Sequence, residues 1–136
     1  MDSIRLRSDG TLSLYEVMKY KYLGKGWAVE YADSEGNYGM GDPYSGAERL
    51  IWEDEGEGPI QADLEKEKPT IKNILGFQKL RHDRDLKLSE TDWVVTKASE
   101  TGVAESDAWK TYRQALRDLP SNTSDPFNPT WPTKPS

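Results

Sequence analysis

The side chains that could catalyse a reaction are sparse in this sequence. His82 is the only histidine of the chain and stands among charged residues in RHDRD. With one imidazole, we predict neither a histidine-based catalytic triad nor a metal site made of several histidines. We interpret His82 as an exposed residue on a helix.

Carboxylates crowd into one short segment, EDEGE, which contains Glu53, Asp54, Glu55 and Glu57. A general acid and a general base need two carboxyl groups in different environments across a cleft. Neighbouring carboxylates in a glycine-rich segment are usually solvated instead. We therefore predict no catalytic residue, and a small acid–base hydrolase that uses this segment is the weakest of three functional hypotheses.

The glycine-rich segment DSEGNYGMGD could be considered as a calcium-binding or phosphate-binding loop. It lacks the alternating ligands and the final bidentate Glu of a calcium loop. It also lacks the glycine spacing and the following amphipathic helix that hold a pyrophosphate. The chain has no cysteine, which excludes disulfides, thiolate zinc sites and cysteine nucleophiles. We predict a plain hairpin turn here, and neither a metal site nor a cofactor in the chain.

Aromatic and arginine side chains gather in the C-terminal part of the chain, on AWKTYRQALRDLP and on both sides of it. One interpretation is a small core in which three tryptophans and a tyrosine pack together. The other is a docking surface, since aromatic and Arg side chains are enriched at binding hot spots and a proline-flanked aromatic can anchor a tail in a groove. The sequence leaves both open, and the candidate partner-binding residues are Trp93, Trp109, Tyr112, Arg113, Arg117 and Trp131.

The composition is lean in apolar residues and rich in charge. Of 136 residues, 35% are hydrophobic and 31% are charged, so aromatic side chains must supply much of any core. The net charge is −6 without a basic stripe that could neutralise phosphates, so we predict no nucleic-acid binding. No signal-peptide pattern begins the chain, and no apolar run approaches the roughly twenty residues of a membrane span. We expect a soluble protein without membrane contact that stays inside the cell that makes it.

The first part of the chain predicts a strand and a helix. Ile4 and Leu6 alternate with polar residues ahead of a Ser-Asp-Gly turn, which is typical of a short strand. Ser13 and Glu16 have the spacing of a capping box, and apolar residues at helical spacing follow them. We expect a helix over about residues 14–23.

A hairpin and an acidic linker are expected next. WAVEY alternates in the manner of a strand, and Tyr38 and Met40 are expected on its return strand after the glycine-rich turn. Residues 53–69 combine repelling carboxylates with glycine and proline, which predicts a linker or an exposed arm.

The C-terminal part predicts helices and an extended tail. An apolar stripe of helical period covers about residues 70–88, and SETDW is expected to end that helix with Trp93 turned inward. VVTKASETGVAES is expected to form a loop, after which Ser106 or its neighbour caps a further helix. Four prolines after Pro120 predict a tail that runs extended along a surface.

Together these elements indicate an α+β fold. We predict a small N-terminal strand, helix and hairpin part over residues 1–52, the acidic linker over 53–69, and a helical part with an extended proline-rich tail over 70–136. The acidity of the chain lies before Thr70, because the remaining residues carry nearly balanced charges. The two halves are therefore expected to differ in function.

Three segments of the C-terminal part form an ordered pattern: RHDRDLKLSETDW, with the frame R-x-x-R-D-x-x-L-x-x-T-D-W, then AWKTYRQALRDLP, and finally WPTKP. Over about residues 78–135 the chain resembles the phage tail assembly chaperone family, small proteins associated with tail-fibre genes of tailed bacteriophages. Many members have an acidic residue and a proline after the Asp-Trp pair, where this chain has VVTKASETGV. The motif positions are Arg81, Arg84, Leu88, Asp92, Trp93, Trp109, Tyr112, Arg113, Leu116, Arg117 and Trp131.

The resemblance implies a non-enzymatic bacteriophage tail protein that binds a tail fibre or baseplate protein and assists assembly in the host cytoplasm. A second hypothesis is a permanent structural component of the virion tail, such as a fibre adaptor or a baseplate-associated protein. The sequence leaves open the identity of the partner, the host, a homo-oligomeric state and the role of residues 1–69.

Overall fold

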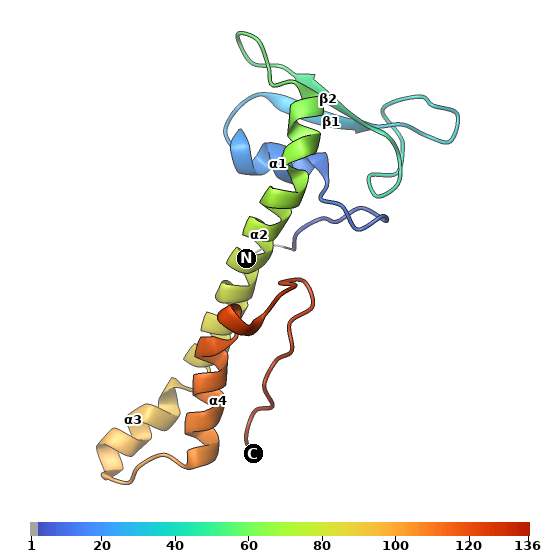
Figure 1. Ribbon diagram of the computed structural model, residues 1–136. Helices are drawn as coiled ribbons and strands as arrows, with labels where there is room; N and C mark the ends of the chain where they lie inside the picture. The colour runs from blue at the N-terminus through green and yellow to red at the C-terminus, as the bar shows by residue number, and fades with distance from the viewer. Residues whose placement is uncertain (1–2) are drawn as a thin grey trace. The chain divides into compact units, whose positions relative to one another are not determined.

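The computed structural model describes residues 3–136 and contains four α-helices, one short 3-10 helix and a two-stranded antiparallel sheet in that part of the chain (Figure 1). This mixture confirms the predicted α+β class. The chain divides between Ile74 and Leu75 into two compact units. We call them the N-terminal unit and the C-terminal unit and describe each by itself.

Helix α1, Leu14–Lys21, begins at the predicted cap. The Ser13 Oγ accepts a hydrogen bond from the Tyr15 backbone N–H at 3.3 Å. The predicted capping box is altered, because the backbone of Arg5 takes the place of its reciprocal contact. The Ser13 N–H donates to the Arg5 carbonyl oxygen at 3.2 Å, and Glu16 Oε1 accepts from the Arg5 N–H at 3.1 Å. The helix is thereby tied to the preceding segment.

The segment before α1 forms a turn with an isolated bridge between Leu6 and Leu12, instead of the expected strand. The Arg7 N–H donates to the Thr11 carbonyl oxygen at 2.8 Å and closes the turn. A single bridge is shorter than a strand because Asp9 accepts from the Thr11 N–H at 2.9 Å, which bends the chain immediately.

Strand β1, Trp27–Tyr31, pairs antiparallel with strand β2, Glu48–Trp52. The prediction that Tyr38 and Met40 lie on the return strand is therefore wrong. Tyr38 forms an isolated bridge with Ala32, and Met40 is 94% exposed. The strand that returns is the apolar run just before the acidic segment.

Two glycines explain why the return strand comes late. The backbone N–H groups of Gly39 and Gly41 both donate to the Tyr31 carbonyl oxygen, at 3.2 and 3.1 Å. A Cβ built on Gly41 would lie 2.1 Å from the Ala32 carbonyl oxygen, so only glycine allows this approach. The backbone folds onto the end of β1 here, and a regular ladder becomes possible only further along the chain.

Helix α2, Gln61–Ser89, starts well before the predicted helix over residues 70–88 and contains Pro69. Residues 61–69 are thus helical, although we expected them in a linker or exposed arm. A proline inside a helix costs about 3 kcal/mol. Two contacts offset part of this cost, because Leu64 is buried and Lys68 Nζ lies 2.5 Å from Glu48 Oε1.

The Gln61 side chain also fastens the start of α2. Its amide nitrogen donates to the Glu48 carbonyl oxygen at 2.7 Å, and its amide oxygen accepts from the Leu50 N–H at 2.9 Å. These two groups of β2 face away from β1. A side-chain amide therefore pairs with the outer edge of the strand.

The core of the N-terminal unit combines apolar side chains with the buried carboxylate of Glu48. Glu48 accepts from the Leu14 N–H at 2.8 Å and forms salt bridges with Lys68 and with Arg7, the latter at 3.4 Å. One side chain of β2 therefore links α1, α2 and the N-terminal turn. The buried apolar residues around it are Leu12, Leu14, Val17, Met18, Tyr31, Ala32, Leu64 and Ile71.

In the C-terminal unit, α2 ends where SETDW predicted it and helix α3, Asp92–Thr101, follows at once. The prediction of a loop over VVTKASETGVAES is wrong for most of that segment. Its polar residues hide the helical pattern because α3 buries little beyond Val94. Gly102 ends the helix with φ at 72°, and its N–H donates to the Ala98 carbonyl oxygen at 3.0 Å.

Helix α4, Asp107–Asp118, begins at the predicted cap, where Ser106 Oγ accepts from the Trp109 N–H at 3.4 Å. A short 3-10 helix, η1, Pro120–Asn122, ends the helical part. Residues 123–136, here called the tail, contain neither helix nor strand, but they are not extended throughout, because the Asn128 N–H donates to the Asp125 carbonyl oxygen at 3.1 Å and closes a turn. Figure 1 shows the tail beside α4.

The tail packs closely on α2 at Gly76. A Cβ built on Gly76 would lie 2.6 Å from Pro126 Cγ and 2.7 Å from Phe127 Cε2. Both distances are too short for carbon atoms in contact, so a larger residue would displace the tail. Gly76 interrupts the predicted apolar stripe, and the absence of a side chain there allows the tail to pack against α2.

Candidate partner-binding site

Three of the predicted site residues form a continuous row of aromatic rings on α3 and α4. The rings of Trp93 and Trp109 meet edge to face, with centroids 5.8 Å apart at 76°. Trp109 and Tyr112 meet in the same way at 6.1 Å and 79°. Such pairs are favourable beyond their buried area.

This aromatic row runs from solvent into the core. Trp93 is 54% exposed, so the expectation that it turns inward is wrong, whereas Tyr112 is only 6% exposed. Trp93 faces outward because Val94 takes the buried position at the start of α3. The small-core interpretation describes one end of the row, and the exposed indole at the other end is available to a partner.

Burial and the nearby Glu90 carboxylate raise the pKa of Tyr112 above its usual value. Both factors disfavour the phenolate form. Tyr112 therefore remains a neutral, buried anchor for the row at physiological pH.

Arg113 is buried and engaged within the C-terminal unit. Its guanidinium donates to the Leu88 carbonyl oxygen at 3.0 Å, to Thr91 Oγ1 at 2.6 Å and to Asp92 Oδ1 at 3.1 Å. These acceptors lie at the end of α2 and the start of α3. Arg113 thus fixes the junction from which Trp93 projects. Thr91, which is fully buried, was not among the predicted site residues, although the T-D-W frame contains it.

Arg117 is exposed and donates to Gln114 Oε1 at 3.2 Å on its own helix. Trp131 of the tail is half-buried and lies apart from the aromatic row, with Lys87 Nζ 5.0 Å from its ring centroid. A cation held against an indole face stabilises both groups by about 0.5–1 kcal/mol. The tail is therefore held by α2 through Trp131 as well as at Gly76.

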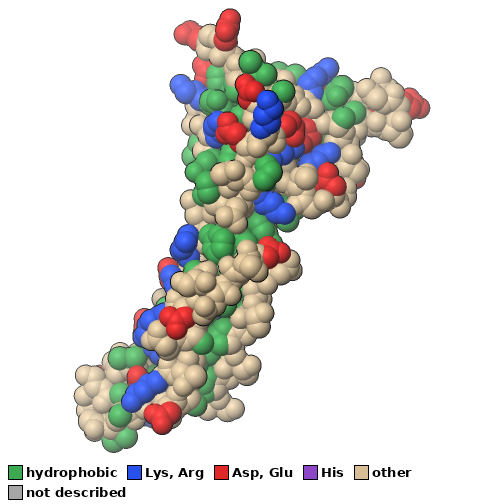
Figure 2. Space-filling view, in the orientation of Figure 1, with side chains coloured by type: hydrophobic (Ala, Val, Ile, Leu, Met, Phe, Trp, Pro, Cys, Tyr) green, Lys and Arg blue, Asp and Glu red, His purple; other side chains and the backbone are tan. Residues whose placement is uncertain are grey.

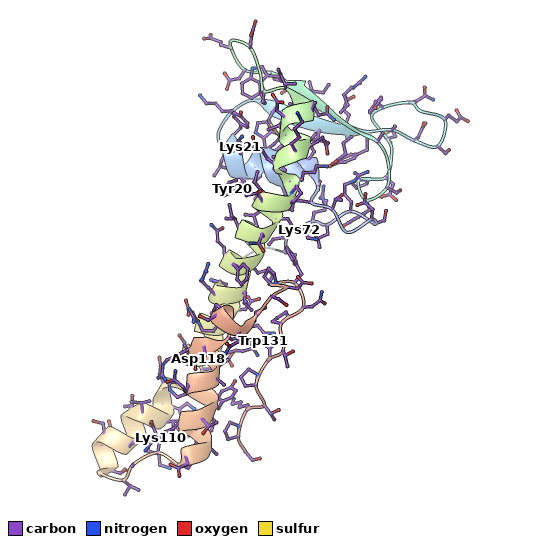
Figure 3. All side chains as sticks on the ribbon, viewed as in Figure 1. Tyr20, Lys21, Lys72, Lys110, Asp118 and Trp131 are labelled. Atoms are coloured by element: carbon purple, nitrogen blue, oxygen red, sulfur yellow. The ribbon has the colours of Figure 1, made fainter. Side chains whose placement is uncertain are left out.

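A groove of about 1010 Å³ lies between α4 and the tail. Figure 3 shows Lys110 and Asp118 on α4 and Trp131 on the tail, and all three line the groove. Of the six predicted site residues, Trp131, Arg113 and Arg117 line the groove. The groove and the exposed end of the aromatic row are both surfaces that could contact another chain.

In the acidic segment that we considered for catalysis, a carboxylate accepts hydrogen bonds from nearby backbone groups. Asp54 accepts backbone hydrogen bonds from Gly26 at 3.1 Å and from Glu55 at 2.8 Å, and these bonds lower the pKa of its carboxyl group. Asp33 in the glycine-rich turn likewise accepts from the N–H groups of Glu35 and Asn37, each at 2.9 Å. Both carboxylates act as turn-forming acceptors.

Within residues 3–136, no three His, Asp or Glu side chains are grouped so as to hold a metal ion. None of the helices in this part of the chain combines the length and the apolarity that crossing a bilayer requires. On the face shown in Figure 2, acidic and basic side chains are interspersed. Nothing in the described residues shows catalytic activity.

The three segments that carried the resemblance thus lie together in the C-terminal unit. Residues 77–136 match the family model for phage tail assembly chaperone proteins. The match runs from α2 to the end of the chain, contains all six predicted site residues and confirms the resemblance. It points to a role in phage tail assembly. The comparisons with curated proteins and with solved structures gave no match.

Proposed function

We propose that this chain binds a tail fibre or baseplate protein of a bacteriophage and assists its assembly without catalysing a reaction. The observation that carries the proposal is the exposed Trp93 at the end of the aromatic row, inside the segment that matches the tail assembly chaperone family. Binding would take place in the host cytoplasm while tails are assembled.

The geometry of the row favours a binding role for its exposed end. Burying the exposed part of an indole stabilises a complex by on the order of 2–3 kcal/mol. Trp109 holds the Trp93 ring edge to face, and Arg113 fixes the start of α3, so little side-chain freedom is lost on binding. Trp93 and Trp109 are therefore proposed to contact the partner directly, whereas Tyr112 and Arg113 position them.

The tail is proposed as the second contact. Trp131 and Arg117 line the groove beside α4, and a partner segment seated there would touch both residues. We further propose that residues 70–136 are the interaction module and that the preceding residues serve a different role, because the family match begins only at residue 77.

Co-expression with the tail fibre protein of the same phage tests this function. The double variant Trp93→Ala/Trp109→Ala is expected to lower the amount of co-purified fibre protein at least fivefold. Tyr20→Ala is the matched control, because Tyr20 is an aromatic residue of similar exposure, 45%, on α1 of the other unit (Figure 3). Circular dichroism of each variant checks that the helices persist.

Failure of wild-type chain to capture either the fibre protein or the baseplate proteins would refute the proposal. Equal losses with the double variant and with Tyr20→Ala would refute the assignment of the site. Quantitative mass spectrometry of purified particles decides between the two hypotheses: a fixed copy number per virion identifies a permanent tail component, and absence identifies a transient chaperone.

A further inference from the structure

A further pocket in the C-terminal unit contains three converging arginines. It is a pocket of about 370 Å³ that we call the arginine pocket, lined by Phe77, Arg81, Arg84, Arg117, Pro120 and Ser121. It lies at the end of α4 opposite to the cap at Ser106, and the aromatic row does not contribute to it.

Helix geometry brings these side chains together. Phe77, Arg81 and Arg84 stand at i, i+4 and i+7 on α2 and therefore share one face of the helix. Arg84 Nη1 donates to the Arg117 carbonyl oxygen at 3.2 Å, in the last turn of α4. The carbonyl groups at the end of a helix carry partial negative charge, which favours a cation at this place. Arg84 thus has a structural role in the pocket.

The guanidinium groups of Arg81 and Arg117 have fewer polar contacts within the chain. Arg81 lies over the Phe77 ring with its Cζ 5.6 Å from the centroid, and Arg117 donates to the neutral Gln114 amide at 3.2 Å. Asp85 forms an ion pair with Arg84 at 2.6 Å, and no salt bridge to Arg81 or Arg117 occurs among residues 3–136. The pocket therefore has excess positive charge in a chain whose net charge is −6.

We propose that the arginine pocket binds the side-chain carboxylates of an acidic segment on the tail partner. A guanidinium group presents a planar fork of donors that matches a carboxylate. Phe77 and Pro120 add apolar walls on which the neighbouring methylene groups of Asp or Glu can pack. A nucleic acid fits less well, because three arginines in one small pocket do not form the extended basic stripe that neutralises successive phosphates, and the chain as a whole has a net charge of −6.

Binding can be tested directly with fluorescein-labelled hexaglutamate, by fluorescence anisotropy on the full-length chain at low salt. Arg81→Gln/Arg117→Gln is expected to weaken binding at least fivefold. Arg84 is left intact because it connects α2 with α4. Lys25→Gln/Lys66→Gln is the control, since it removes the same charge from exposed positions outside the arginine pocket and the groove and is expected to change binding less than twofold.

This inference rests on the proposed function only for the source of the acidic segment, and the two fail separately. No binding of hexaglutamate to the wild-type chain, or equal weakening by both double variants, overturns the arginine pocket. Tighter binding of a labelled dodecathymidine than of hexaglutamate through the same two arginines also overturns it. Capture of hexaglutamate without capture of any tail protein leaves the pocket standing and refutes the proposed function.

In co-expression, Arg81→Gln/Arg117→Gln is expected to reduce capture of the fibre protein at least threefold, with the Lys25→Gln/Lys66→Gln control unaffected. Unchanged capture, with hexaglutamate binding lost, would overturn the assignment of the carboxylates to the tail partner.

Discussion

A buried charged side chain of each unit, Glu48 in the N-terminal unit and Arg113 in the C-terminal unit, has its charge compensated in a different way. In the N-terminal unit, the Glu48 carboxylate lies between the cationic groups of Lys68 and Arg7. In the C-terminal unit, the Arg113 guanidinium is held mainly by the neutral oxygens of Leu88 and Thr91. Its ion pair with Asp92 involves a carboxylate that is largely exposed.

The difference shows what each unit loses when the charge is removed. Charges buried together depend on each other, because the partner left behind has no water to replace the lost contact. Carbonyl and hydroxyl dipoles left behind cost less, because they carry only partial charge. The N-terminal unit should therefore be more sensitive to such a substitution than the C-terminal unit.

The largest effect is expected for Glu48→Ala. It leaves Lys68 only its ion pair with the exposed Glu65 carboxylate and also removes the partner of Arg7 and of the Leu14 N–H. The free energy of unfolding of the N-terminal unit should therefore fall by about 3–5 kcal/mol. Urea unfolding combined with hydrogen exchange at the buried Val17 and Met18 measures the loss. Arg49→Ala, which breaks an exposed ion pair with Glu30, serves as the control and should cost less than about 1 kcal/mol. Similar losses for both variants would contradict the role of burial.

A smaller effect is expected for Arg113→Ala. The Leu88 carbonyl and the Thr91 hydroxyl lose their donor, which should cost about 2–3 kcal/mol. The junction between α2 and α3 should loosen. The indole of Trp93 should then be more exposed to solvent, and its fluorescence emission should shift to longer wavelength. Arg113→Lys should recover only part of this stability, because an ammonium group cannot reproduce the fork. A loss as large as that of Glu48→Ala would remove the contrast between the two units.

The smallest effect on stability is expected for Gly76→Ala, which tests how the C-terminal unit holds its tail. Alanine favours a helix over glycine by roughly 1 kcal/mol. The added Cβ also displaces Pro126 and Phe127, which should offset the gain at a cost of about 1–2 kcal/mol. Hydrogen exchange should accelerate at Phe127 and Asn128, and not in the control Gln78→Ala. A tail equally protected in both variants would contradict the close packing.

Local signals in the sequence predicted the features that depend on neighbouring residues. Ser13 and Ser106 cap their helices as their positions indicated, and the prolines keep the tail free of helix and strand. The contact of Trp109 with Tyr112 follows from their helical spacing. Such features need no knowledge of the rest of the chain.

The errors concern features fixed by distant residues. The return strand was misplaced because the approach of Gly41 to the end of β1 is not visible in a local pattern. The early start of α2 depends on contacts of Gln61 and Lys68 with β2, which override the unfavourable Pro69. Helical spacing indicated that Trp109 and Tyr112 meet, but only the placement of Val94 decides that Trp93 faces solvent.

The pairing of Gln61 with β2 has a further consequence for how the molecule behaves at high concentration. A strand with free backbone groups along its edge can recruit a strand from another molecule, and such recruitment leads to aggregates. The Gln61 amide occupies two of these groups on β2, the carbonyl of Glu48 and the N–H of Leu50. The small sheet is thus capped on that side by a side chain, and α2 begins at the residue that provides the cap.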